Sequence, residues 1–134
     1  MAIPIVPLVL IGVGLIACSA ALKTPKSKRV LFDLAGSEWG FGDGSDRFVQ
    51  FSDDKEFRGN GGCNNFFGTY DLNGTRLKVG PIASTKRACP ELDQEREFLT
   101  ALQKATRIEA THLVLKFFDV NGDELLLLKR RDWD

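Results

Sequence analysis

Two cysteines, Cys63 and Cys89, are the side chains of this sequence best suited to covalent chemistry. Cys63 lies in residues 59–70, GNGGCNNFFGTY, and Cys89 lies in residues 83–90, ASTKRACP. Glycine and asparagine tolerate left-handed backbone conformations, so the first run predicts a tight loop followed by an aromatic strand. A cysteine pair can act as a redox-active thiol centre or as a structural disulfide. Which of the two applies depends on the compartment, and therefore on the N-terminal segment.

Residues 1–22 carry no charged side chain, and their apolar run ends at Leu15-Ile16-Ala17-Cys18. A leucine, an aliphatic residue, a small residue and a cysteine, in that order, form the pattern of a bacterial lipobox. We therefore expect residues 1–17 to be a signal peptide and Cys18 to become the lipidated N-terminus. The acyl chains would make a membrane the first partner of the protein.

The segment after Cys18 adds detail to this expectation. Residues 18–30 contain Pro25 and several basic side chains, which is typical of a tether, and residues 31–134 form the expected folded domain. Ser19 follows the cysteine, and by the sorting rules of Gram-negative bacteria this favours the outer membrane, with the domain facing the periplasm. Basic residues follow the apolar run and none precedes it, so an uncleaved membrane anchor is the alternative.

If Cys18 carries the lipid, two cysteines remain, Cys63 and Cys89. An even number of cysteines suits an exported protein with one disulfide. Closing this loop would lower the entropy of the unfolded chain by about 3.5 kcal/mol at room temperature. Two reduced, buried thiols are the alternative. Thiol-dependent redox activity is a further reading, but no histidine neighbours either cysteine.

Other chemistry has little support in the sequence. His112 is the single histidine, no pair of ligands has zinc spacing, and we expect no metal and no cofactor. Residues 119–124 resemble the start of a calcium loop, but Glu124 stands where glycine is required and Arg130 stands where the bidentate glutamate is required. Lysine plus arginine and aspartate plus glutamate number 18 each, so the net charge gives no reason to expect a nucleic-acid partner.

The surrounding pattern predicts an α+β domain, a curved antiparallel sheet with one packed helix. Short strand-like runs occupy residues 47–51 and 56–58. Two hairpins are expected, one around Asn73-Gly74 with a type I′ turn and one around Asn121-Gly122. Leu125 to Leu128 do not alternate with polar residues, which predicts a strand buried on both faces. Pro90 to Ala105 form the expected helix, with Leu92, Phe98, Leu99 and Leu102 facing the core.

These segments together resemble the META domain family, the HslJ-like small envelope lipoproteins. The resemblance rests on Gly62-Cys63-Asn64, on the aromatic run 67–70, on Thr85 and the basic segment that ends in Cys89-Pro90, and on the helix residues 95–102. It implies the fold given above, a location in the cell envelope and a role in stress tolerance or envelope integrity, and it supplies no catalytic residue.

The expected function is therefore that of a non-enzymatic, monomeric envelope lipoprotein that binds an unidentified envelope protein or a small ligand. Two alternatives remain. One is redox activity at Cys63 and Cys89, and the other is inhibition of an envelope enzyme by an exposed loop such as residues 41–46.

Overall fold

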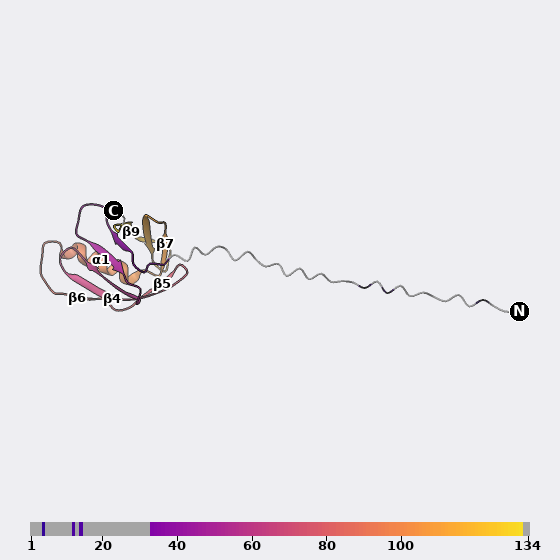
Figure 1. Ribbon diagram of the computed structural model, residues 1–134. Coiled ribbons are helices and arrows are strands. Elements are labelled where there is room, and N and C mark those ends of the chain that lie inside the picture. Colours follow the sequence, from indigo (N-terminus) through magenta and orange to yellow (C-terminus); the bar gives the residue numbers. More distant parts are fainter. Residues whose placement is uncertain (1–3, 5–11, 13, 15–32, 133–134) are drawn as a thin grey trace.

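The computed structural model of the chain describes residues 4, 12, 14 and 33–132 (Figure 1). Cys18 and the tether expected at residues 18–30 lie outside the described residues, as does almost all of the expected signal peptide. None of the helices in the described part is both long enough and apolar enough to cross a membrane.

Short antiparallel strands and one helix make up residues 33–132. In chain order the elements are β1 (Glu38–Gly40), β2 (Phe48–Phe51), β3 (Glu56–Asn60), β4 (Asn65–Asn73), β5 (Arg76–Val79), β6 (Ala83–Ser84), α1 (Leu92–Lys104), β7 (Arg107–Ala110), β8 (Val114–Phe118) and β9 (Glu124–Arg130). This confirms the α+β prediction of an antiparallel sheet with one packed helix.

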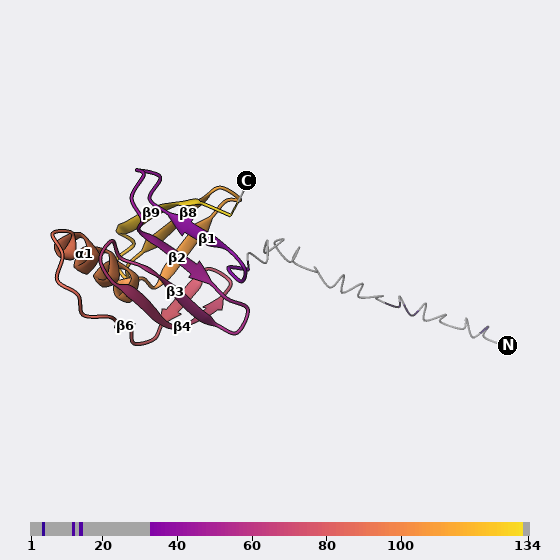
Figure 2. The ribbon, with the colours of Figure 1, turned by 60° about the vertical axis from the view of Figure 1, so that its left-hand side comes forward.

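The sheet closes on itself, which the sequence pattern did not predict. Its strand order is β3-β2-β1-β9-β8-β7-β5-β4-β6, and β3 also pairs with β4. The additional pairing joins Glu56 to Thr69 and Asn60 to Asn65, so eight strands form a ring and β6 extends it along β4. α1 contacts β5, β8 and β9 and lies beside the ends of the strands in the two ribbon views (Figures 1 and 2).

The core fills the inside of this ring. Fully buried side chains come from strands on all sides and from the helix; the largest are Trp39, Phe66, Phe98, Phe117, Leu34, Ile108, Leu115 and Leu128. Aromatic rings meet edge to face between Phe66 and Phe98, whose centroids are 5.5 Å apart. Such pairs add stabilisation beyond the burial of their area, so the helix is tied to β4 by specific geometry.

The helix was predicted within two residues at each end. Asp93 lies in its first turn and Lys104 in its last, each at the end of the dipole that favours its charge. Its buried residues are Glu95, Phe98 and Leu102, whereas Leu92 and Leu99 of the predicted stripe are half-buried. The core-facing stripe therefore begins with a carboxylate rather than with a leucine.

Both hairpins form where the sequence predicted them, but the first turn is not of the predicted type I′, and the second turn is not of that type either. That type needs positive φ at both central residues. In the first turn, between the paired residues Asn73 and Arg76, only Gly74 has positive φ, at 63°. In the second, Gly122 has φ of 83° and donates its N–H to the Asp119 oxygen at 3.1 Å, while Asn121 keeps negative φ.

The prediction that β9 is buried on both faces is wrong. Leu126 and Leu128 are 8% and 0% exposed, while Leu127 between them is 43% exposed. β9 lies in the closed ring, so its inner face meets the core and its outer face meets solvent. The leucine run thus alternates in burial although it does not alternate in residue type.

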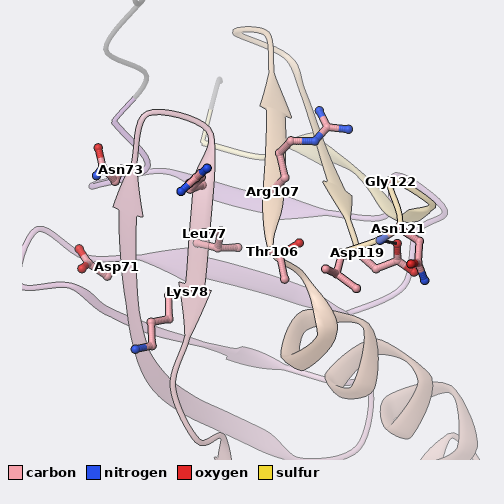
Figure 3. A pocket seen from close by; sticks show the side chains of 11 residues that line it. Asp71, Asn73, Leu77, Lys78, Thr106, Arg107, Asp119, Asn121 and Gly122 are labelled. Atoms are coloured by element: carbon pink, nitrogen blue, oxygen red, sulfur yellow. Dashed lines mark hydrogen bonds between the residues drawn. The ribbon is translucent and has the colours of Figure 1, made fainter.

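The ring has one short seam, between β5 and β7. These strands share a single residue pair, Arg76 with Arg107, supported by N–H bonds from Leu77 to Thr106 oxygen (3.0 Å) and from Ile108 to Thr75 oxygen (2.9 Å). An open cleft of about 700 Å³ adjoins the seam. Figure 3 shows that its labelled charged side chains point away from one another, so they form no convergent site.

The alternating burial of β9 can be tested with two neighbouring truncations. We expect Leu128→Ala to lower the free energy of unfolding by about 2–5 kcal/mol, because it leaves a cavity in the closed core. Leu127→Ala should change it by less than about 0.5 kcal/mol, since this side chain already meets solvent. Urea unfolding followed by tryptophan fluorescence measures both, and equal costs would contradict the assignment of faces.

Candidate functional site

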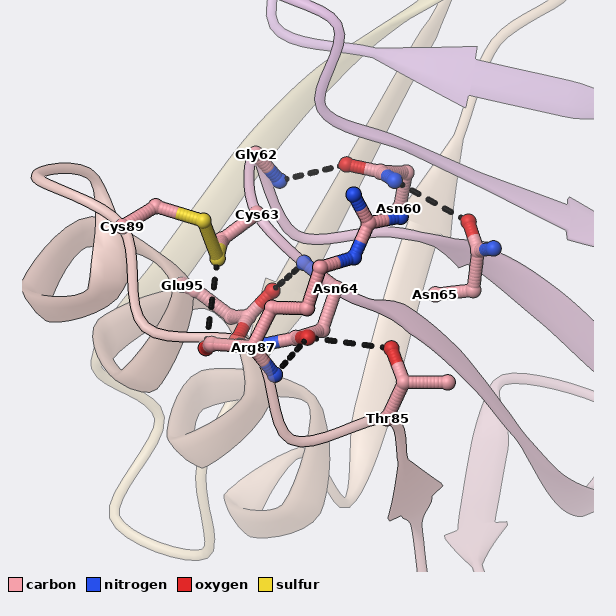
Figure 4. The surroundings of a disulfide bond; sticks show 9 residues. All are labelled: Asn60, Gly62, Cys63, Asn64, Asn65, Thr85, Arg87, Cys89 and Glu95. Carbon is pink, nitrogen blue, oxygen red and sulfur yellow. Dashed lines mark hydrogen bonds between the residues drawn. A yellow bond between two sulfur atoms is a disulfide. The ribbon is translucent and has the colours of Figure 1, made fainter.

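Cys63 and Cys89 are joined by a disulfide that links the loop before β4 to the residues before α1. Their Cα atoms are 5.9 Å apart and they are separated by 26 positions in the sequence (Figure 4). Cys63 is buried at 8% exposure, and Cys89 is half-buried. The Cys63 sulfur also lies 3.4 Å from the Arg87 carbonyl oxygen, a contact without a proton because a bridged sulfur carries no hydrogen.

Asn64, the next residue, uses its whole amide group to hold the segment that follows β6. Its side-chain oxygen accepts the Arg87 N–H at 2.6 Å and the Thr85 hydroxyl at 3.0 Å. Its side-chain nitrogen donates to the Arg87 carbonyl oxygen at 3.1 Å and to Glu95 Oε2 at 2.8 Å. Asn64 is 2% exposed; its bond to Glu95 is buried, and the three bonds to Thr85 and Arg87 are partly buried.

Glu95 completes this arrangement from the first turn of α1. Its Oε1 accepts the Asn64 backbone N–H at 2.6 Å, and its side chain is 3% exposed. A Cβ atom at Gly61 would collide with the Glu95 side chain, so glycine is needed there for close approach. Glu95 is the first residue of the helix segment 95–102 in the family signature, but its burial and its bonds to Asn64 were not predicted.

The residues of the predicted signature thus come together in one place (Figure 4). Gly62 takes a φ of 107° and donates its N–H to Asn60 Oδ1 at 2.7 Å, which shapes the loop. Thr85 and Cys89 anchor the other segment, and Pro90 is exposed in the turn that leads into α1. The local role of these residues is to fix one segment against another.

An open groove of about 400 Å³ lies between α1 and residues 84–88. Its lining includes two leucines, Leu92 and Leu99, and three basic residues, Lys86, Arg87 and Arg96. All of residues 85–88 are exposed. The scaffold described above therefore presents an exposed, basic segment.

The loop of residues 41–46 has its own internal support. Arg47 bonds Asp43 at 2.8 Å, and its guanidinium lies 3.8 Å from the centre of the Phe41 ring. Hydrogen bonds from Ser45, followed by the bond from Arg47, lower the pKa of Asp43 to about 2. This loop is acidic at its tip and is not part of the disulfide region.

Elsewhere, His112 is exposed in the bend before β8 rather than on the strand. No group of three or more histidine, cysteine, aspartate or glutamate side chains in the described part is arranged to hold a metal ion. The acidic turn at residues 119–123 forms hydrogen bonds within itself, from the N–H groups of Asn121 and Asp123 to Asp119 Oδ1.

Comparison with known proteins places this fold in a family. The family model of the META domain matches residues 30–132, which confirms the resemblance read from the signature. No curated protein matches the chain.

Solved structures share the fold at low sequence identity. An NMR structure of a protein from Burkholderia xenovorans is 22% identical, with a TM-score of 0.62, 74% of this chain covered and 84% of that one. A DUF4847 family protein from Bacteroides vulgatus is 18% identical, with a TM-score of 0.52, covering 66% of this chain and 62% of that one. Another NMR structure is 19% identical with a TM-score of 0.54, covering 73% of this chain and 90% of that one.

Because the Asn64 side chain holds two segments together, we expect its truncation to lower the free energy of unfolding far more than truncation of its neighbour. Asn64→Ala removes one buried and three partly buried hydrogen bonds and leaves the Glu95 carboxylate with one donor, so we expect a loss of about 3 kcal/mol or more in the free energy of unfolding. Asn65→Ala is the matched control, because Asn65 is exposed and should cost less than about 1 kcal/mol. Urea unfolding compares the two, and similar losses would contradict the anchor.

The hydrogen bonds within the loop of residues 41–46 predict that the Asp43 carboxylate stays ionised at unusually low pH. Because the folded pKa of Asp43 is depressed, its contribution to stability is present above the ordinary pKa of 3.8 and is lost as the pH falls through about 2. Carboxyl NMR titration should give a midpoint near 2 for Asp43, and Ser45→Ala should raise it. An unchanged midpoint in Ser45→Ala would show that Ser45 does not set this pKa.

Proposed function

Because the chain belongs to the META domain family, we propose that it is a non-enzymatic binding module of the bacterial envelope, tethered to the membrane and active in stress tolerance or envelope integrity. The observation that supports this most is the use made of the signature residues. The disulfide of Cys63 and the hydrogen bonds of Asn64 and Thr85 hold the exposed residues 85–88 in place. Such a scaffold serves the presentation of a surface.

The membrane tether is supported by the sequence and by the disulfide. Leu15-Ile16-Ala17-Cys18 has the order of a lipobox, and disulfides persist mainly in exported proteins. We propose that residues 1–17 are removed, that Cys18 is acylated, and that the domain faces the periplasm from the outer membrane. An unidentified envelope protein or a small ligand is the proposed partner of the monomer.

The pairing of Cys63 with Cys89 also bears on the alternative of a thiol-dependent activity. A disulfide has no thiolate, so neither cysteine could attack a substrate until a reductant had opened the bond. No histidine lies among the residues around the bond in Figure 4 that could activate a thiol. These points favour a structural role for the pair.

The tether is tested by mass and by membrane partition in a Gram-negative host. We expect the wild-type chain to lack residues 1–17, to carry acyl chains at Cys18 and to sediment with the outer membrane, because acyl chains bury many methylene groups. Cys18→Ala should be released from that fraction. Under non-reducing conditions the mass should also be lower by two hydrogens for the Cys63–Cys89 bond.

Two controls make this experiment decisive. Cys63→Ala with Cys89→Ala should lose the bond but keep the acyl chains, which separates anchoring from folding. A full-length, unacylated chain that stays in the membrane as Cys18→Ala would overturn the lipoprotein proposal and support the uncleaved anchor. A free thiol at Cys63 or Cys89 in freshly isolated envelopes would instead support the thiol-dependent alternative.

A further inference from the structure

The connection between β6 and α1 projects from the domain as an exposed segment. In both ribbon views it bows outward beside α1, on the opposite side from the start of the folded domain in indigo (Figures 1 and 2). Residues 85–88 are all exposed and belong to neither a helix nor a strand.

Alternate residues of this segment are fixed to the domain. The Thr85 N–H donates to the Asn65 oxygen at 3.0 Å. The N–H and the carbonyl oxygen of Arg87 are both held by the buried Asn64 amide, at 2.6 and 3.1 Å. Cys89 is fixed by its disulfide to Cys63. The segment is therefore ordered before any partner arrives, although it packs little apolar surface.

Lys86 lies between two of these fixed points and has its polar groups available. Neither its backbone N–H, nor its carbonyl oxygen, nor its ammonium group has a hydrogen bond or ion pair with the part of the chain that the structure describes. It is exposed to solvent. Thus a partner could pair with the Lys86 main chain and enclose its side chain at the same time.

A serine protease makes this combination of contacts. Its oxyanion hole receives the carbonyl oxygen of the residue before the cleaved bond, and a trypsin-like protease encloses a basic side chain in a pocket with an aspartate at its base. A flexible loop loses conformational freedom on binding, whereas a loop already held in one conformation avoids much of that cost. We propose that residues 84–88 are an inhibitory loop for a trypsin-like serine protease, with Lys86 in its specificity pocket.

The fixed position of Arg87 explains why binding would inhibit the protease without net cleavage of the loop. Attack by the protease serine on the Lys86 carbonyl carbon forms an ester and breaks the bond to the Arg87 nitrogen, which takes the proton through the protease histidine. Asn64 and the Cys89 disulfide keep that amine in place. It can attack the ester, restoring the peptide bond and the free serine before water enters.

The other loop considered from the sequence fits this partner less well. Residues 41–46 carry Asp43 and Asp46 and no basic side chain, so they would repel an acidic specificity pocket. The inference names a partner class for the binding module proposed above and rests on that proposal for its envelope location. Inhibition itself does not depend on acylation, so the two proposals fail separately.

The test uses the full chain in non-ionic detergent, with pancreatic trypsin and a small arginine amide substrate. We expect inhibition at near-stoichiometric concentrations, and Lys86→Ala should weaken it by about 100-fold or more, as for a central interface residue. Lys78→Ala is the matched control, since Lys78 is an exposed lysine on β5 that forms no ion pair within the described part of the chain. It should inhibit like the wild type.

A gain of function distinguishes a specific loop from a damaged domain. Lys86→Phe should lose trypsin inhibition and acquire inhibition of chymotrypsin, whose pocket accepts aromatic side chains. Any slow cleavage after Lys86 should give two fragments only under reducing conditions, because the Cys63–Cys89 bond joins them.

Three results would overturn the proposal. One is rapid cleavage at Lys86 without inhibition, which would make the segment a substrate. Another is inhibition that Lys86→Ala leaves intact, and the third is no effect on trypsin at all. Acylation at Cys18 together with any of these would leave the envelope tether standing and remove only the protease partner.

Discussion

The structure depends on one buried amide. The Asn64 side chain binds Glu95 of α1 on one side and the backbone of Arg87 on the other, while its own N–H holds Glu95 again. A single residue of 2% exposure therefore fixes two segments that lie 23 and 31 positions after it in the sequence. A buried polar group that is fully bonded specifies one arrangement, because each alternative would leave a donor or acceptor unpaired.

The position of the helix follows from this constraint. Glu95 is held in the first turn, so Phe98 and Leu102, three and seven residues later, lie on the same face and reach into the ring. The Phe98 ring then makes T-shaped contacts with Phe66 and Phe41, at centroid separations of 5.5 and 5.0 Å. The polar anchor sets where the helix sits, and the aromatic contacts stabilise it there.

Much of the fold could be predicted from residue patterns, and the exceptions share a cause. The helix and both hairpin positions follow from local signals, and the pairing of Cys63 with Cys89 follows from the two cysteines that remain in an exported chain once Cys18 is assigned to the lipid. Closure of the ring, the exposed Leu127 and the buried Glu95 do not, because each depends on which distant strand or loop lies alongside. Leu127 was predicted to be buried because residue type was the only guide, and no local pattern distinguishes the buried Glu95 from the exposed Asp93 and Glu97 of the same helix.

The seam between β5 and β7 gives the ring a preferred place to open. β5 and β7 share one residue pair, whereas the neighbouring strand pairs β4–β5 and β7–β8 share several. Local fluctuations would therefore separate β5 from β7 first and leave these neighbouring pairings intact. The C-terminal end of α1 leads into β7 at this seam, whereas its N-terminal end, about 20 Å away, carries Glu95 and the disulfide region. The ring can therefore open transiently between β5 and β7, at one end of the helix, while residues 85–88 at the other end keep their conformation.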